Sequence, residues 1–266
     1  MIIDIHTHAF PESLASRAVD ELAKRSGLQP KTDGTCRGLV ASTRRAEIEL
    51  SVIAPIATKP GQASAINGWA IETNRNYSEL TCFGTIHPDM EDWKEEIARL
   101  VNERFVGIKM HPDYQGFFVD EPRMFPIYEK LADAGMILLL HAGIDVGLPF
   151  PTHCTPERLA NMMRHVPGLT IIAAHMGGYR QWDAVDRYLV GKNIYFDTAC
   201  SLRSMGPRRM REMILLHGVD KILFGTDSPW EDQQEAIRDI RELNLSEEEQ
   251  EAILGKNAWR LLNANL

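Results

Sequence analysis

Two histidines, His6 and His8, lie one residue apart in the opening segment MIIDIHTHAF. Because side chains alternate between the two faces of a strand, both imidazoles would point to the same side. Imidazole nitrogens bind divalent metal ions and exchange protons near neutral pH. A lone histidine in an apolar strand is more often a hydrogen-bonded core residue, so the pair needs partners elsewhere in the chain to form a site.

Polar side chains also end several later apolar segments. His141 ends MILLLH, His175 lies in IIAAHMGG, and Asp227 lies in LFGTDSPW. The segment FVGIKMHP carries Lys109 and His111. These residue types can bind a metal ion, transfer a proton and hold an anionic substrate.

We predict a metal site built from three histidines and one aspartate: His6, His8, His141 and Asp227. This donor set suits zinc or a similar divalent ion and leaves a position open for water, whose pKa the ion would lower toward about 7. His175 would move a proton or hold a substrate oxygen, and Asp227 could share the proton transfer. The alternative role of Asp227 is to cap a helix that begins near SPW.

The segments that must position these residues alternate between strands and helices. Eight apolar segments read as buried strands, beginning at Ile2, Leu50, Leu80, Phe105, Met136, Leu169, Ile194 and Lys221. Helical spacing occupies residues 91–105, 123–135, 155–168 and 246–263. Eight such repeats predict an α/β fold, a closed (β/α)8 TIM barrel that forms one domain over residues 1–266, with its chemistry at the C-terminal strand ends. A doubly wound open sheet is the alternative, but the chain has no glycine-rich dinucleotide or phosphate motif.

Composition argues against several classes of partner. Asp and Glu number 37 against 29 Lys and Arg, which gives a net charge of -8. This charge disfavours binding to nucleic acid or to anionic membranes, and small molecules remain as the expected partners. The 4 cysteines form no CxxC pair, which favours a reducing compartment. We find no segment with the pattern of a signal peptide or of a membrane span, and we therefore expect a cytoplasmic protein. The sequence leaves open whether the protein forms a homo-oligomer.

The motifs DIHTHAFP, GIKMHPDYQGF, LLLHAG, IIAAHMGG, LFGTDSPW and ILGKNAWRLL resemble those of the amidohydrolase superfamily, in particular the amidohydrolase-related (amidohydrolase 2) group. The resemblance extends over nearly the whole chain. It implies that His6, His8, His141 and Asp227 bind one divalent metal ion and that His175 contacts water or substrate. The group contains hydrolases of amides and lactones, decarboxylases and a hydratase, so the resemblance indicates the site more firmly than the reaction.

Four further residues are candidates for substrate binding: Lys109, His111, Tyr114 and Arg203. Lys109 or Arg203 could bind a substrate anion, and Tyr114 could form a pocket wall. By the same resemblance, a carboxylated Lys109 could instead bridge two metal ions. Each of the four also has an ordinary structural or surface role as its alternative.

Two aspartates have roles that the sequence leaves open. Asp4 lies two residues before His6, so both side chains are expected on the same face of the strand. Asp4 could therefore contact a metal ligand from beneath it, or its role could be purely structural. Asp197 could line the pocket or cap a turn.

We expect a hydrolase that uses metal-activated water on a small amide, lactone or ester. Some decarboxylases of the group carry a carboxylate in place of the first histidine, so His6 favours hydrolysis, although other decarboxylases keep both histidines. The alternative on the same site is a metal-dependent decarboxylase of an aromatic or unsaturated carboxylic acid. A binding protein without activity is disfavoured because no ligand position is missing.

Overall fold

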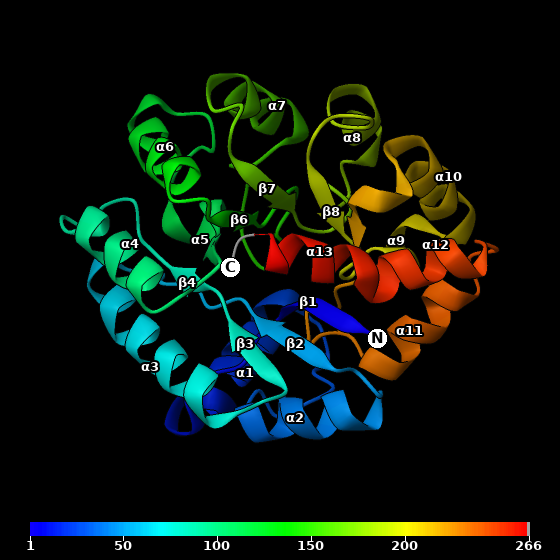
Figure 1. The fold of residues 1–266 in the computed structure, drawn as a ribbon, viewed down its shortest axis with the longest axis horizontal. Helices are drawn as coiled ribbons and strands as arrows, with labels where there is room; N and C mark the ends of the chain where they lie inside the picture. The colour runs from blue at the N-terminus through cyan, green and yellow to red at the C-terminus, as the bar shows by residue number, and fades with distance from the viewer. Residues whose placement is uncertain (265–266) are drawn as a thin grey trace.

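The computed structural model describes residues 1–264 and shows strands and helices alternating along the chain (Figure 1). The strands are β1 Ile3–Thr7, β2 Leu50–Ile53, β3 Leu80–Cys82, β4 Gly84–Thr85, β5 Gly107–Met110, β6 Ile137–Leu140, β7 Thr170–Ala173, β8 Tyr195–Asp197 and β9 Ile222–Leu223. The helices are α1 Glu12–Ser26, α2 Cys36–Arg45, α3 Ala63–Asn76, α4 Trp93–Asn102, α5 Pro112–Gln115, α6 Phe125–Asp133, α7 Pro156–His165, α8 Trp182–Tyr188, α9 Leu202–Met205, α10 Pro207–His217, α11 Gln233–Arg241, α12 Glu247–Glu251 and α13 Asn257–Asn263. All eight predicted strands are present, the third being divided into β3 and β4.

Neighbouring strands pair in parallel, in the orders β1-β2-β3 and β4-β5-β6-β7-β8-β9. The two sheets are continuous through Phe83 on one side, and a backbone hydrogen bond joins them on the other. The N–H of Phe83, between β3 and β4, donates to the Ile53 carbonyl at 2.9 Å, and the Ile5 N–H donates to the Phe224 carbonyl at 2.9 Å. The prediction of a (β/α)8 TIM barrel is confirmed, and its extension over residues 1–266 as one domain stays a prediction.

Alternate strand residues supply two cores because successive side chains point to opposite faces. Leu139 and Ile172 face the barrel interior, whereas Leu138 and Ile171 pack against the surrounding helices. Burial on both faces is typical of parallel strands covered by helices. It explains why the strand sequences are almost continuously apolar.

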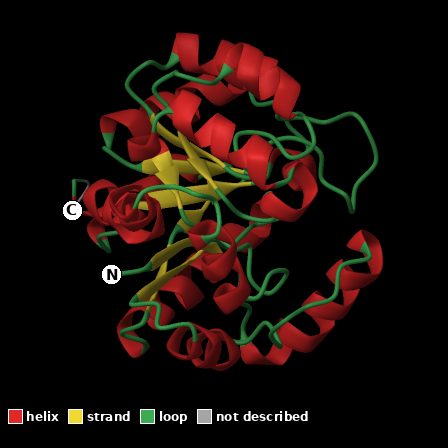
Figure 2. Cartoon of the chain, turned by 90° about the vertical axis from the view of Figure 1, so that its right-hand side faces the viewer, coloured by secondary structure: helices red, strands yellow, loops and turns green. Residues whose placement is uncertain are grey.

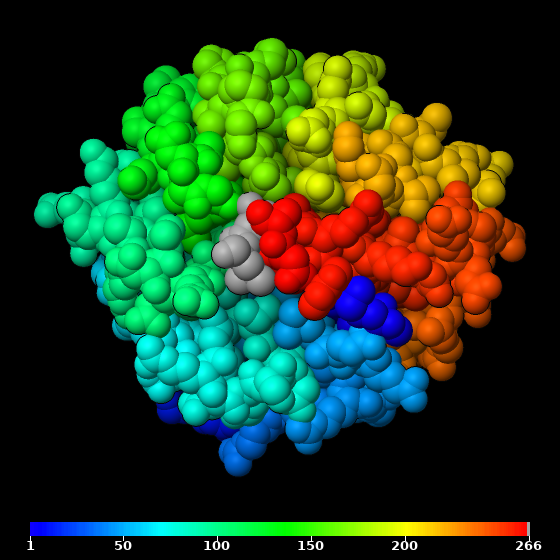
Figure 3. Space-filling view, viewed as in Figure 1, coloured from blue at the N-terminus to red at the C-terminus, as the bar shows by residue number. Residues whose placement is uncertain are grey.

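Helix α13 covers the end of the barrel at which the strands begin. Its residues Ala258 and Leu262 join the interior core, and the helix lies across the centre of this face beside the N-terminus (Figures 1 and 3). The helix predicted over 246–263 is interrupted by a π-helical turn, Ala252–Lys256. Within this turn, a Cβ at Gly255 would lie 2.4 Å from the Met1 carbonyl oxygen. With this end covered, a site must open at the other end.

A β-bulge in β1 sets the direction of its side chains. Asp4 pairs with Ser51 and Thr7 pairs with Ile53, so β1 spans one residue more than β2 between these two pairs. A bulge reverses the alternation of side chains beyond it. Residues before and after the bulge therefore cannot be assigned to faces by simple parity.

The bulge corrects the expectation that Asp4 lies below His6 on one face. The Asp4 carboxylate accepts hydrogen bonds from Thr226 Oγ1 at 2.6 Å and from Gln233 Nε2 at 2.8 Å. Asp4 thus fixes Thr226, the residue before Asp227, and it contacts no ligand side chain directly. Its role is to hold the turn after β9 against β1.

The open end of the barrel lies opposite the termini, where Figure 2 shows a helix and a long loop projecting from the strands. Helix α1 and the loop after β6 approach each other there, since a Cβ at Gly147 would lie 3.5 Å from the Cβ of Arg25. None of the helices in residues 1–264 is long and apolar enough to cross a bilayer.

Candidate metal-dependent active site

A cavity of about 630 Å³ opens at the C-terminal ends of the strands. It is lined by all of the predicted site residues: His6, His8, Lys109, His111, Tyr114, His141, His175, Arg203 and Asp227. Parallel strands all end on the same side, which is why residues so far apart in the sequence meet here.

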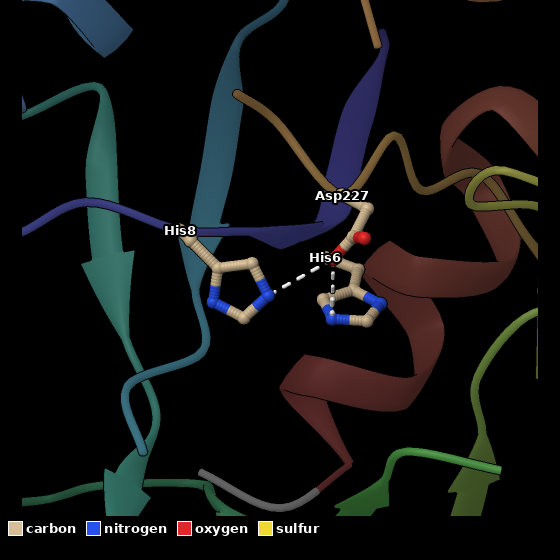
Figure 4. A group of neighbouring side chains, drawn as sticks. All are labelled: His6, His8 and Asp227. Atoms are coloured by element: carbon tan, nitrogen blue, oxygen red, sulfur yellow. Dashed lines mark hydrogen bonds and ion pairs between the residues drawn. The ribbon is translucent and has the colours of Figure 1, made fainter. Parts of the chain in front are cut away.

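His6, His8 and Asp227 form a compact group of potential metal ligands (Figure 4). Their ligand atoms all lie within 4.8 Å of one another. Asp227 Oδ1 is 2.9 Å from His8 Nε2 and 3.3 Å from His6 Nε2. The Asp227 N–H donates to the His6 carbonyl at 2.7 Å, so the pairing of β1 with the segment after β9 holds the carboxylate beside both imidazoles.

The carboxyl group of Asp227 is held in its ionised form. Burial acts to raise its pKa, but the imidazoles of His6 and His8 outweigh this effect and keep the pKa well below its ordinary value. An ionised carboxylate can bind a cation or accept a proton. Both functions predicted for Asp227 therefore remain chemically available to it.

Asp197, at the end of β8, determines which nitrogen of His6 is unprotonated. Burial acts to raise the pKa of Asp197, but His6 and His175 lower it below its ordinary value, so the carboxylate only accepts hydrogen bonds. His6 Nδ1 donates to Asp197 Oδ2 at 2.9 Å, which leaves a lone pair on His6 Nε2. The other carboxylate oxygen accepts from the His175 N–H at 2.8 Å. Asp197 therefore supports two predicted site residues from behind.

A second chain of hydrogen bonds determines the state of His141. His175 Nδ1 lies 3.0 Å from the Ala199 carbonyl, which can only accept, so this nitrogen carries a proton. In neutral His175, Nε2 then accepts from His141 Nδ1 at 3.1 Å. His141 Nε2 is consequently unprotonated, and it is buried without a hydrogen-bond partner in the described part of the chain. Such an unpaired buried lone pair is costly unless a cation binds it.

His111 has both ring nitrogens engaged. Its Nδ1 accepts from the Tyr114 N–H at 3.3 Å, so its Nε2 carries the proton that it donates to Asp145 Oδ2 at 3.2 Å. His111, His141 and Asp145 lie close enough to hold an ion, but His111 offers no free lone pair. The His111 ring stacks on His141 with centroids 4.1 Å apart and so orients that ring.

Lys109 is a buried cation beside the predicted ligands. Its Nζ donates to His6 Nε2 at 3.1 Å. Burial lowers the pKa of Lys109 to about 8, while Asp227 and Asp197 oppose the shift. At neutral pH the ammonium form therefore still predominates, and it faces the cavity, where a substrate anion could pair with it.

Tyr114 and Arg203 lie farther from the ligand group. Tyr114 packs edge-on against His111 with ring centroids 4.5 Å apart and forms part of the cavity wall. Arg203, on α9, has a side chain that is 60% exposed and paired with Glu235, so it lies at the rim in a surface ion pair. The structure thus places Arg203 away from the buried histidines.

Two cavity residues, Asp145 and Glu231, were not anticipated from the sequence. Each follows a predicted ligand, His141 or Asp227, by four positions in an irregular loop. Proximity to those ligands was the only signal that could have found them. Glu231 accepts a hydrogen bond from the Cys200 N–H at 2.8 Å, and burial raises its pKa to about 8.

The residues present fit a divalent cation. His141 Nε2 has an unpaired lone pair, His6 Nε2 is unprotonated, and Asp227 is ionised beside His8. Imidazole donors suit zinc, and carboxylate donors suit manganese or magnesium. A mixed set of this kind does not by itself select one metal.

Comparison with known proteins identifies the family, because the amidohydrolase family model matches residues 3–264. The chain belongs to the amidohydrolase family. It is therefore an enzyme of the amidohydrolase superfamily, as its motifs implied. No curated protein matches the chain.

Several solved structures match almost the whole amidohydrolase chain. A TIM-barrel protein from Bordetella bronchiseptica, described as uncharacterized, has 20% identity and a TM-score of 0.76, with 98% of each chain covered. The 2,6-dihydroxybenzoate decarboxylase from Rhizobium has 19% identity and a TM-score of 0.71, with 100% of this chain and 99% of that chain covered. The 5-carboxyvanillate decarboxylase from Novosphingobium aromaticivorans, complexed with manganese and 4-hydroxy-3-methoxy-5-nitrobenzoic acid, has 16% identity and a TM-score of 0.75, with 99% and 96% covered. These likenesses support the TIM-barrel fold.

The same structures correct the main functional prediction. Most of the similar structures whose names state a reaction are decarboxylases. The prediction of an amide, lactone or ester hydrolase is therefore wrong as the leading interpretation, and the names of these structures favour the decarboxylase alternative. The argument from His6 failed because one donor set serves either reaction. Zinc is not specifically supported either, since the metal named is manganese.

Proposed function

We propose that this amidohydrolase-family protein is a divalent-metal-dependent decarboxylase of an aromatic or unsaturated carboxylic acid. The observation that carries the proposal is the group of His6, His8 and Asp227, with His175 and Lys109 facing the same cavity. The decarboxylases among the similar structures support this reaction over hydrolysis. A small-molecule partner follows, whereas a cytoplasmic location and a homo-oligomer stay predictions.

We assign the metal to His6, His8 and Asp227, whose ligand atoms lie together, and to His141, whose unpaired Nε2 belongs to a residue lining the same cavity. A divalent ion bound there would supply positive charge that polarises and orients a substrate oxygen. Manganese and zinc both remain candidates, and elemental analysis of the purified protein distinguishes them.

The chain's own residues would orient the substrate and move its proton. The Lys109 ammonium would pair with the substrate carboxylate, and Asp227 would accept a proton from a neighbouring hydroxyl. A protonated His175, with its Nε2 turned from His141 Nδ1 toward the substrate, would deliver the Nε2 proton to the carbon that bears the carboxylate. The bond from that carbon to the carboxylate then breaks, carbon dioxide leaves, and the electron pair stays on the carbon as part of its new C–H bond. Asp227 would then return its proton to the substrate oxygen, and solvent would restore the proton on His175.

The proposal is tested by product analysis in deuterated water. Protein loaded with manganese or with zinc is incubated with hydroxybenzoic acids and, in parallel, with lactones and amides. We expect carbon dioxide together with a product that carries one deuterium at the former carboxylate position, measured by NMR. Turnover of a lactone or amide, with no carbon dioxide from any acid, would overturn the proposal.

A further inference from the structure

We infer that the substrate of this site carries an extended apolar group remote from its reacting carboxylate, and that helix α1 forms the wall that binds it. The inference rests on the proposed function for the identity of the reacting group. Its basis is an apolar part of the cavity wall beside the predicted ligands, whereas charged side chains such as Arg203, Glu231 and Glu235 line other parts of the same cavity.

The apolar wall comes from segments that are far apart in the sequence. Leu14 and Leu22 lie on α1, Ile66 and Trp69 lie on α3, and Trp230 follows β9. These side chains line the same cavity as the predicted ligands, so the apolar wall is continuous with the reactive floor. A molecule that reaches from floor to opening would therefore pass from charged to apolar surroundings.

Helix α1 presents more apolar surface than its own packing requires. Ala15 and Val19 are its buried residues, and one such stripe is enough to dock a surface helix. Leu22 widens this stripe toward the cavity, and Leu14, next to Ala15, adds a further apolar side chain that lines the cavity and is 52% exposed. An apolar ligand that covers an exposed leucine at the mouth of a cavity removes apolar surface from water, and this burial stabilises the complex.

The cavity is also larger than a single-ring acid at its floor requires. Its volume of about 630 Å³ lies within the range of roughly 300–1,000 Å³ that encloses drug-sized ligands. A small acid on the floor would leave Leu14 and Trp69 uncovered. An alkyl or aryl extension of the acid is the occupant that covers them while its carboxylate meets Lys109.

Binding of para-alkylbenzoates to the metal-loaded protein tests the inference by calorimetry. The Kd should fall roughly threefold for each methylene added between benzoate and para-hexylbenzoate. Leu14→Asp should remove most of this length dependence, so that para-hexylbenzoate binds little better than benzoate to this variant. The matched control is Leu216→Asp on α10, where the leucine is 70% exposed and lies outside the cavity lining, and it should keep the full dependence.

Equal affinity for benzoate and para-hexylbenzoate would overturn the inference, as would a length dependence that survives Leu14→Asp. The inference would also be overturned if the molar mass of Leu14→Asp in solution were half that of the unsubstituted protein. The apolar wall would then belong to a contact between two copies of the chain. Binding is measured without turnover. A length dependence with no decarboxylation of any acid would therefore refute the proposed function alone.

Discussion

At the scale of single residues, hydrogen bonds decide which histidine nitrogens can bind a cation. Asp197 accepts a hydrogen bond from the Nδ1–H of His6, and His175 Nε2 accepts one from the Nδ1–H of His141, which leaves Nε2 unprotonated on each predicted ligand. Residue type and strand position led to the prediction that His6 and His141 are ligands, and the structure places both in one cavity. These protonation states depend on neighbours from other strands, which is why the sequence could not supply them.

Replacing His175 separates proton transfer from metal binding. His175→Ala should retain the metal, because His175 is assigned no ligand position, and should lower decarboxylation by about 10²–10⁴-fold through loss of a general acid. Elemental analysis and initial rates measure the two effects. His153→Ala, in which the lost imidazole pairs with Asp113 and does not line the cavity, should keep both properties. Loss of metal from His175→Ala would instead place His175 among the ligands.

Asp197→Asn tests the control of the His6 tautomer. The amide can donate a proton toward His6 Nδ1, which would favour a proton on Nε2 and weaken the ligand. We expect metal affinity to fall by roughly 10- to 100-fold, measured by competition with a chelator. Asp183→Asn, at a carboxylate that is 100% exposed, is the matched control and should bind metal normally. Equal affinity in the two variants would refute this role of Asp197.

Glu231 should make stability depend on pH. Burial raises its pKa from 4.5 to about 8, so the folded protein holds a proton that the unfolded chain loses at lower pH. Its contribution to stability is therefore complete below pH 4.5 and decreases as the pH rises toward 8. Glu231→Gln cannot ionise, so its Tm relative to the wild type should be higher at pH 8.5 than at pH 4. The exposed Glu242→Gln should show no such difference, and a pH-independent effect of Glu231→Gln would contradict the argument.

At the scale of elements, the strands were predictable and their irregularities were not. Buried parallel strands are short apolar runs bounded by glycine, proline or polar residues, and that pattern located all eight. The bulge in β1 depends on the register against β2, which no local pattern encodes. Asp145 and Glu231 lie in loops without periodicity, so nothing predicted their place in the cavity.

Phe83 connects the two parts of the third strand and fills the barrel interior. It is fully buried, and a Cβ at Gly107 would lie 2.9 Å from its ring. Phe83→Ala should lower the free energy of unfolding by about 3–5 kcal/mol. The substitution removes a buried ring and leaves a cavity that the neighbouring side chains cannot fill. Urea unfolding measures the change. Phe150→Ala, at a phenylalanine that is 76% exposed, is the matched control, and an equal cost in both would show that the ring of Phe83 is not part of a packed core.

At the scale of the whole molecule, the two ends of the barrel have different tasks. Helix α13 and the π-helical turn cover one end, and the predicted ligands line the cavity at the other. In TIM barrels the former end serves stability and the latter serves catalysis. Changes at the covered end should therefore alter folding without altering the chemistry.

Gly255→Val tests this separation. The added side chain would meet the Met1 carbonyl oxygen, since a Cβ at this position would lie only 2.4 Å away. We expect a lower Tm, measured by calorimetry, and an unchanged kcat per folded molecule. Gly61→Val, where a Cβ meets nothing within 4 Å, should leave the Tm almost unchanged. A loss of kcat in folded Gly255→Val would mean that the two ends are coupled.

The position of Met1 beside α13 also determines how the molecule can be attached to other things. A surface, a fluorescent label or a second protein linked through the N-terminus would sit against the covered end, on the far side of the barrel from the cavity. The opening would then face the surrounding solution. An immobilised form of this protein should consequently admit its substrate as freely as the dissolved one.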